Sequence, residues 1–181
     1  MILLFEKTII HMQSFKKVLL LGNLVLTLLV GLPWGGAQVV FEINDFKAEK
    51  ESLTTVNDAK LFSSFLRVCP ATSNTQGAAW YSEQKINLAD GFYTEFEFKI
   101  RNTDNAQDGG DGFCFVMQNQ GSRVVGGTGN NLGYRNLDRA VAIEFDIVQD
   151  VGEESANHVC LSFFDPEKGY YRKYATVHSI P

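Results

Sequence analysis

From Val39 onward, short apolar runs alternate with polar turns, and no long stretch has helical periodicity. In the segment 92–100, FYTEFEFKI, Phe, Thr and Ile occupy every second position, with Tyr, Glu and Lys between them. Because strand residues two apart share a face, this segment predicts a strand with one core face and one solvated face. Further strands are predicted at 113–118, 140–148 and 158–164.

Two segments between these strands have the composition of loops. Residues 102–112 read NTDNAQDGGDG, and the long glycine- and asparagine-rich segment 120–136 contains GGTGNNLGY. Many short strands at this spacing predict an all-β fold, an antiparallel β-sandwich of the jelly-roll kind, and 14 Phe residues supply its core. The sequence stops at Ser179-Ile180-Pro181 without a closing strand pattern, so we expect the C-terminal strands of the sandwich to be missing from this chain.

The N-terminal segment has the layout of a secretory signal peptide. Lys16 and Lys17 precede an uncharged apolar run at 18–32, and small residues lead to Ala37. The run is shorter than the ~20 residues that a membrane-spanning helix needs, so a retained anchor is the second interpretation. We predict a leader at 1–37, whose true start is Met12 if ordinary proportions hold, and a domain at 38–181. The expected location is outside the cell or in the secretory pathway.

The charge and the cysteine content of the chain limit the kinds of partner and metal site that can be expected. The formal net charge is −5. Since nucleic-acid binding needs clustered cations, the acidic balance argues against a nucleic-acid partner and suits calcium better. An oxidising compartment allows disulfides, but three cysteines leave one thiol over. No CxxC is present, so a structural zinc site is not expected, and Cys114 and Cys160 fit small buried positions.

The strand 140–148 carries the most informative chemistry. Glu144 and Asp146 lie two residues apart and therefore share a face. Two like charges held side by side repel unless a cation lies between them. His158 opens the next strand, and a divalent ion with oxygen ligands and one imidazole suits this pattern. The opposite face is predicted to be buried and comprises Val141, Ile143, Phe145 and Ile147.

The order of the segments resembles that of the L-type lectin-like fold, shared by legume lectins, related bacterial and protist lectin domains, and animal cargo lectins. The match covers roughly residues 40–165. The segments that carry the resemblance are GAAWYSEQKINLADGFYTEFEFKI, GGDGFCFVMQN, the glycine-rich loop ending in LGY, AVAIEFDIVQD and NHVCLSF. Each piece alone is a weak signal, but the ordered combination is specific.

The resemblance implies a calcium ion, with a transition metal such as Mn²⁺ beside it. By position, Asp146 would bridge both ions, and Glu144 and His158 would complete the transition-metal site. The Val148 carbonyl and the Asp150 side chain would reach calcium. The loop acid falls at Glu154 or Glu153, where an aspartate is usual.

The resemblance also implies a sugar site. Asp111, after a small residue and a peptide that is usually cis, would accept hydrogen bonds from two sugar hydroxyls. A main-chain amide of the glycine loop, at Gly129 or Asn130, would donate. The third member is usually an asparagine, but Asp150 stands there and cannot donate. Val148 replaces the aromatic ring that stacks on the sugar in many relatives.

A catalytic alternative comes from the same sandwich architecture. Laminarinase-like glycoside hydrolases carry Glu-x-Asp-x-x-Glu, with a nucleophile first and an acid/base last, and retaining hydrolysis needs two carboxyls ~5 Å apart. Glu144 and Asp146 fit the start of this motif, but Gln149 at its end cannot transfer a proton. We therefore expect no catalytic residues and no enzyme.

The sequence thus predicts calcium-dependent, non-catalytic binding of glycans or glycoproteins by a secreted lectin. A structural or cargo-sorting sandwich that binds no sugar is the alternative. A membrane partner is expected only if an anchor follows Pro181, and a homo-oligomer is left open.

Overall fold

The computed structural model describes residues 2–12, 38–88, 91–101, 109–153, 155–165 and 167–178. The regular elements that can be delimited in these residues are strands and one short 3₁₀ turn. They are β1 (Ile2–Met12), β2 (Gln38–Ile43), β3 (Leu53–Asn57), β4 (Lys60–Leu61), β5 (Leu66–Cys69), β6 (Gly77–Tyr81), β7 (Tyr93–Arg101), β8 (Gly112–Met117), η2 (Gly129–Asn131), β9 (Val141–Asp146), β10 (His158–Asp165) and β11 (Tyr170–His178).

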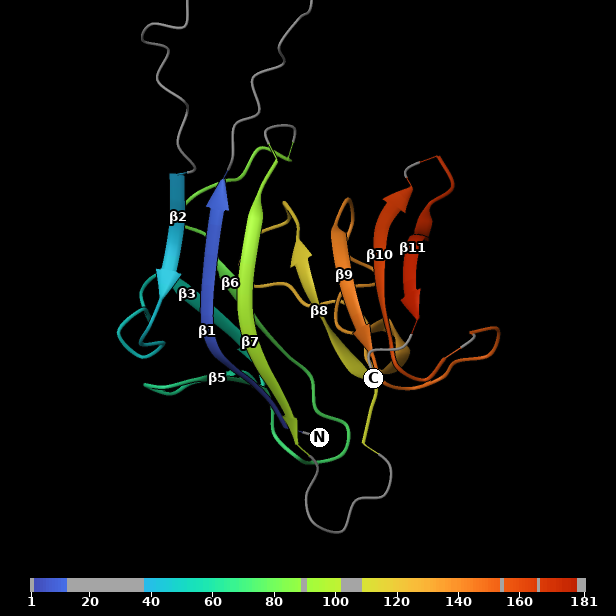
Figure 1. Cartoon of the computed structure of the whole chain (residues 1–181), viewed down its shortest axis with the longest axis horizontal. Helices are drawn as coiled ribbons and strands as arrows, with labels where there is room; N and C mark the ends of the chain where they lie inside the picture. The colour runs from blue at the N-terminus through green and yellow to red at the C-terminus, as the bar shows by residue number, and fades with distance from the viewer. Residues whose placement is uncertain are drawn as a thin grey trace, which may run out of the picture.

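The strands form three antiparallel sheets (Figure 1). One sheet has the order β2-β1-β5-β4, with β7 also paired to β1. A second has the order β11-β10-β9-β8, and β3 and β6 make a small third sheet. In Figure 1, β7 of the first sheet lies next to β8 of the second. The prediction of an all-β antiparallel sandwich is confirmed.

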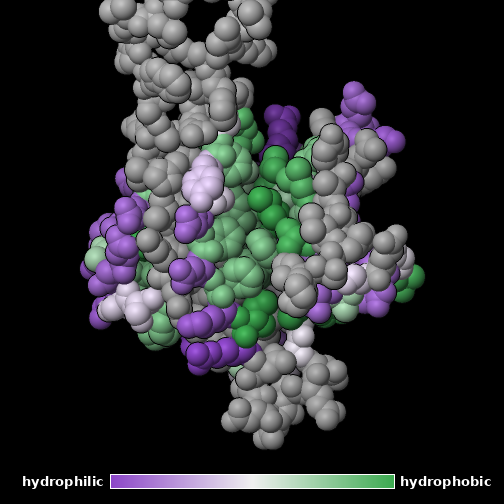
Figure 2. Space-filling model, viewed as in Figure 1, coloured by the Kyte–Doolittle hydropathy of each residue, from purple (hydrophilic) through white to green (hydrophobic). Residues whose placement is uncertain are grey.

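Aromatic rings join the two larger sheets. The Phe113 ring stacks on Phe145 with centroids 4.5 Å apart, and it meets the edge of Phe98 at 4.7 Å. Phe96 approaches Phe145 at 5.9 Å. Figure 2 shows apolar side chains gathered between the sheets. Alternating Phe positions on β7 thus contact the second sheet, although Phe98 is 36% exposed and the predicted core face of β7 is only partly buried.

A second apolar cluster lies on the other face of β9. Its buried members come from the glycine-rich loop and the start of β9: Leu132, Tyr134, Leu137, Ala140 and Ala142. Backbone hydrogen bonds fold this loop on itself, with Gly126 N to Gly133 O and Gly127 N to Arg135 O both at 2.7 Å. The loop therefore acts as a cover over the face that carries Glu144.

This cover corrects one prediction. The sequence predicts that the apolar face of β9 is the buried one, but its members Val141, Ile143 and Phe145 are only half-buried. The opposite face is buried, and Glu144 is 0% exposed. The glycine-rich loop causes this burial, because its Leu and Tyr side chains pack over the small residues and the carboxylates on this face of β9.

The four predicted strands are confirmed to within two residues at each end, and one further strand, near the C-terminus, was not predicted. Residues Tyr170–His178, without an alternating pattern, form β11 and pair with β10 along its whole length. Lys173 lies opposite Ser162 in this pairing. The pairing brings a lysine to the face that carries the carboxylates.

The N-terminal segment is described only in part. Residues 2–12 of the predicted leader form β1, which pairs with β2, β5 and β7. The apolar run at 18–32 lies outside the described residues. In the part of the chain that the structure describes, no helix is long and apolar enough to cross a membrane. The leader stays a prediction.

Candidate metal and carbohydrate site

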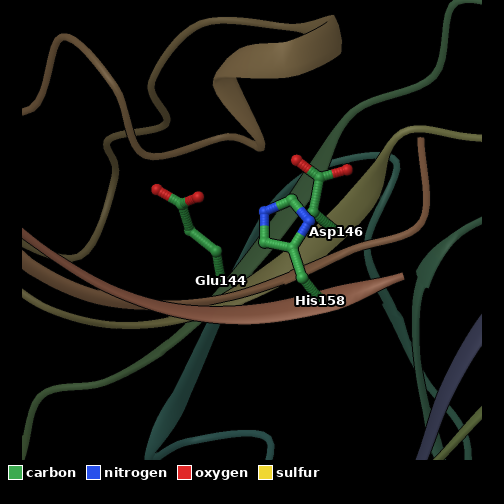
Figure 3. Close-up of side chains that lie close together, drawn as sticks. All are labelled: Glu144, Asp146 and His158. Atoms are coloured by element: carbon green, nitrogen blue, oxygen red, sulfur yellow. The ribbon is translucent and has the colours of Figure 1, made fainter. Parts of the chain in front are cut away.

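Strand register brings the predicted metal ligands together. In the β9–β10 pairing, His158 lies opposite Asp146, and Glu144 follows two residues earlier on the same face of β9. One ligand atom from each of the three side chains lies within 4.8 Å of the others, and all three residues are buried (Figure 3). Two carboxylates and an imidazole at this spacing are a donor set that divalent transition metals accept.

Two hydrogen bonds to one of its carboxylate oxygens hold the Glu144 side chain in a single orientation. Its Oε1 accepts hydrogen bonds from the Tyr134 hydroxyl and, at 2.6 Å, from Ser162. Its Oε2 is buried and has no hydrogen-bond partner among the described residues. A buried carboxylate oxygen without a hydrogen-bond donor is costly, because the hydrogen bonds that it made to water have not been replaced. This oxygen therefore fits a cation.

Asp146 connects the cluster to the following loop. Its Oδ1 accepts the Val148 amide at 3.0 Å, which turns the chain out of β9. Burial raises the pKa of the Asp146 carboxyl and the charge of Glu153 raises it further, against the Val148 hydrogen bond and nearby positive charge. The carboxylate is thus destabilised by its surroundings, and a bound cation would reverse this effect.

His158 presents the correct nitrogen to the cluster. Its Nδ1 lies 3.1 Å from the Ser155 carbonyl oxygen. Because a carbonyl only accepts, the bonded Nδ1 carries the proton, and Nε2 of the neutral ring keeps a lone pair. A carbonyl behind the imidazole is the usual arrangement that orients a metal-binding histidine.

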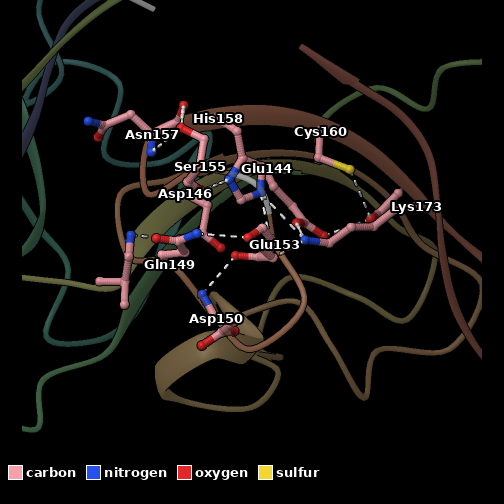
Figure 4. A network of polar contacts seen from close by, with 12 residues as sticks. Glu144, Asp146, Gln149, Asp150, Glu153, Ser155, Asn157, His158, Cys160 and Lys173 are labelled. Atoms are coloured by element: carbon pink, nitrogen blue, oxygen red, sulfur yellow. Dashed lines mark hydrogen bonds and ion pairs between the residues drawn. The ribbon is translucent and has the colours of Figure 1, made fainter. Parts of the chain in front are cut away.

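Lys173 from β11 enters the same cluster (Figure 4). Its Nζ contacts Glu153 Oε1 directly, lies 3.7 Å from Glu144 Oε2 and 3.4 Å from His158 Nε2. Burial alone would lower the pKa of Lys173, but the hydrogen bond to Glu153 and the charges of both glutamates raise it. Lys173 is therefore a fixed ammonium among the candidate ligands.

Glu153 connects the loop to this lysine. Its Oε2 accepts the Asp150 amide at 2.9 Å, while its Oε1 accepts from Lys173. Although partial burial alone would raise the pKa of Glu153, these two hydrogen bonds and the nearby positive charges lower it. Of the two loop acids considered from sequence, Glu153 lies at the cluster, and Glu154 lies outside the described residues.

The remaining predicted calcium ligands are not gathered in the same way. Asp150 is not a member of the compact group formed by Glu144, Asp146 and His158 among the described residues. In Figure 4 its carboxylate points away from that group, while its amide faces Glu153. The donor set therefore fits one ion directly, and the calcium ligands stay a prediction.

The predicted sugar residues lie beside this loop. The Gly110–Asp111 peptide is cis, and Asp111 is half-buried. A methyl group added at Gly129, which is exposed on η2, would lie 3.8 Å from Asp111 Oδ2. Gly129 and the carboxylate thus face one another, and both line a cleft of about 1000 Å³. The neighbouring Asn130 is also exposed.

Contacts tie Asp111 to the metal loop. The Asp111 carbonyl accepts the Ile147 amide at 3.0 Å. A side chain at Gly110 would come within 2.5 Å of Val148 Cγ2, so only glycine fits against this valine. Val148, which replaces the expected aromatic ring, therefore packs against the peptide that carries Asp111.

Three polar neighbours of the cluster were not identified from sequence: Tyr134, Ser162 and Lys173. Ser162 had a usable signal, because it alternates with His158 and Cys160 on one face of a predicted strand. Tyr134 belongs to the LGY sequence, but its role depends on how the loop folds. Lys173 had no signal, because its strand lacks an alternating pattern.

One comparison with known proteins bears on this arrangement. A model of the family described as the legume lectin domain matches residues 38–164 of this chain. The matched range begins directly after the predicted leader. It contains β2 to β9, nearly all of β10, the glycine-rich loop and the cluster of Glu144, Asp146 and His158.

Proposed function

Because this chain belongs to the legume lectin domain family, we propose that it binds carbohydrate in a calcium-dependent manner and catalyses no reaction. The partners are glycans or glycoproteins. The proposed location, outside the cell or in the secretory pathway, is supported by the leader predicted from the sequence. The observation that carries the proposal is the position of the Asp111 carboxylate beside Gly129, on a peptide fixed by the loop that follows Asp146.

Recognition would use groups that are already in place. The Asp111 carboxylate would accept hydrogen bonds from two sugar hydroxyls, and the exposed amide at Gly129 or Asn130 would donate one. Since the Ile147 amide and Val148 side chain hold the Asp111 peptide, little ordering is needed when the sugar arrives. Asp150 supplies no donor, so the proposed site relies on the other two elements.

Bound metal ions would stabilise the loop that holds the Asp111 peptide in place. Glu144, Asp146 and His158 would hold a transition metal such as Mn²⁺, and Asp146, Val148 and Asp150 would serve calcium. When bound, the ions supply positive charge that fixes the loop. The chain's own contribution is the contact from that loop to Gly110 and Asp111.

Burial of the carboxylates supports a non-catalytic role. Glu144 is 0% exposed and holds hydrogen bonds from Tyr134 and Ser162, so it has no open path to a glycosidic bond. Gln149 is exposed, and its amide donates to the Glu153 carbonyl at 2.8 Å. Neither residue is arranged for the two-carboxylate mechanism of retaining hydrolases.

An Asp111→Asn variant tests the sugar site. We expect it to weaken binding to the glycans that the wild type selects on an array by about tenfold or more, because hydrogen bonds to a charged acceptor contribute ~1.5–3 kcal/mol. Asp138→Asn is the matched control, since Asp138 is exposed and pairs only loosely with Arg139 at 3.7 Å. Equal loss in both variants would argue against Asp111 as a ligand.

Calcium dependence has its own measurement. We expect excess calcium to raise the melting temperature relative to a chelator, since an ion that binds only the folded state stabilises it. An unchanged melting temperature would remove the calcium part of the proposal. Binding to no glycan on the array would leave a sandwich that sorts or scaffolds without sugar.

A further inference from the structure

Lys173 lies beside two of the three candidate metal ligands, Glu144 and His158. Its Nζ lies close to acceptor atoms from three strands or loops: Glu144 Oε2 at 3.7 Å, His158 Nε2 at 3.4 Å and Glu153 Oε1 in direct contact. The first two belong to residues of the compact ligand group. The ammonium therefore already supplies positive charge beside Oε2, the oxygen of the Glu144 carboxylate that has no hydrogen-bond donor among the described residues.

The two cations compete for the same electron pairs. A metal ligated by His158 uses the Nε2 lone pair, because Nδ1 is engaged with the Ser155 carbonyl. Lys173 donates toward that same lone pair. Glu144 Oε2 is likewise the only free oxygen of its carboxylate, since Oε1 is occupied by Tyr134 and Ser162.

Geometry also allows the lysine to leave. Its side chain is 33% exposed, whereas those of Glu144 and His158 are 0% and 2% exposed. A long, partly exposed side chain can swing its ammonium toward water more easily than two buried ligands can move. Arg135, 3.8 Å from Glu144 Oε1, would remain as positive charge at the other oxygen.

We propose that Lys173 is a built-in counter-cation of the Glu144–Asp146–His158 cluster, which a divalent transition metal must displace in order to bind. The proposal rests on the metal part of the proposed function and adds a regulating residue to it. Lys173 stabilises the ion-free cluster and weakens its affinity for metal. It also holds Glu153, so its displacement would release a further carboxylate toward the ion.

Lys173→Met tests this competition, because Met keeps the length of the side chain and removes the charge. We expect the ion-free variant to melt at a lower temperature than the wild type. We expect it to bind Mn²⁺ at least tenfold more tightly in calorimetric titration of the full chain, and saturating Mn²⁺ should restore its melting temperature. Lys173→Arg keeps the charge and should stay close to the wild type in Mn²⁺ affinity.

Lys168→Met is the matched control, since Lys168 is an exposed lysine in the β10–β11 turn and its removal changes the net charge equally. It should leave both measurements unchanged. Equal or weaker Mn²⁺ binding by Lys173→Met, or no binding by either protein, overturns the proposal. Sugar binding is not part of the readout. Tighter Mn²⁺ binding without any glycan recognition would support this proposal while removing the lectin function.

If Lys173→Met does not fold, the displacement of Lys173 can be measured in the wild-type protein. Amine acetylation followed by peptide mass spectrometry measures how accessible each lysine is. At saturating Mn²⁺, labelling of Lys173 should increase severalfold relative to Lys168, because its ammonium has been displaced toward solvent. Labelling that stays constant or falls overturns the proposal.

Discussion

Among single residues, Glu144 has the environment that constrains the molecule most. A carboxylate at 0% exposure needs charge and donors around it, and here Tyr134 and Ser162 donate to one oxygen while Lys173 faces the other. Burial and the bond to Glu144 hold the pKa of Tyr134 well above its usual range. Its hydroxyl therefore remains a donor at any ordinary pH.

Tyr134→Phe should destabilise the ion-free protein by about 1–3 kcal/mol, because it removes a donor from a buried charge and replaces it with nothing. Urea denaturation would measure the change in free energy of unfolding. Tyr93→Phe is the control, since Tyr93 is 52% exposed and its hydroxyl bonds Glu95 at the surface. A cost at Tyr134 no larger than at Tyr93 would mean that the Glu144 bond contributes little.

For single strands and loops, the contact between β8 and β9 determines where the two halves of the site lie. Gly112 pairs with Asp146 across this contact, so Asp111 is the last residue before the ladder begins. A Cβ at Gly112 would come within 2.2 Å of the Phe145 carbonyl oxygen. Its φ of +147° also disfavours any other residue.

Gly112→Ala should therefore cost roughly 3 kcal/mol or more in stability, since positive φ alone costs ~1–3 kcal/mol and a clash with backbone is added. Gly121→Ala separates the two effects. Gly121 has a similar φ of +119°, but no atom lies within 4 Å of its added Cβ. Thermal unfolding of the two variants measures the difference. Similar melting temperatures would show that β8 can move away from β9.

Strand prediction succeeded where short apolar or alternating runs lie between polar turns. The segments 92–100, 113–118, 140–148 and 158–164 correspond to β7, β8, β9 and β10. Glu144 and Asp146 were also correctly predicted to share one face and to lie near His158. These features depend on residues two apart and on adjacent strands, which are local properties of the chain.

Three features could not be predicted because they depend on contacts distant in sequence. The burial of the polar face of β9 requires the glycine loop to fold over it. β11 has no alternating pattern, and its pairing with β10 alone makes it a strand. Lys173 reaches Glu144 only through that pairing. The spacing of Asp111 and Gly129 along the chain does not indicate that they lie together, and only the resemblance to the lectin family predicts it.

At the scale of the whole molecule, a small group of phenylalanine rings joins the two larger sheets. Phe113 is 5% exposed and touches rings from both sheets, Phe98 on β7 and Phe145 on β9. Rings at these separations add to the free energy of burial. The sheets should therefore unfold in one transition.

Phe113→Ala should lower the free energy of unfolding by about 3–5 kcal/mol, the usual range for a buried Phe that leaves a cavity. Phe62→Ala is the control, because Phe62 packs on Phe65 after the short strand β4, away from the contact between sheets. Denaturation followed by both tryptophan fluorescence and circular dichroism would report the result. Equal costs in the two variants would contradict a joining role for Phe113.

The position of β1 has a consequence for maturation. Residues 2–12 lie between β2 and β7 in the first sheet, yet they belong to the segment that cleavage after Ala37 would remove. The cut would leave facing backbone edges on β2 and β7, and such edges pair readily with any extended chain. Proteolytic processing and strand exchange would then be coupled. Removal of the predicted leader would therefore leave a place for a peptide strand between β2 and β7, supplied by the protein itself or by a neighbour.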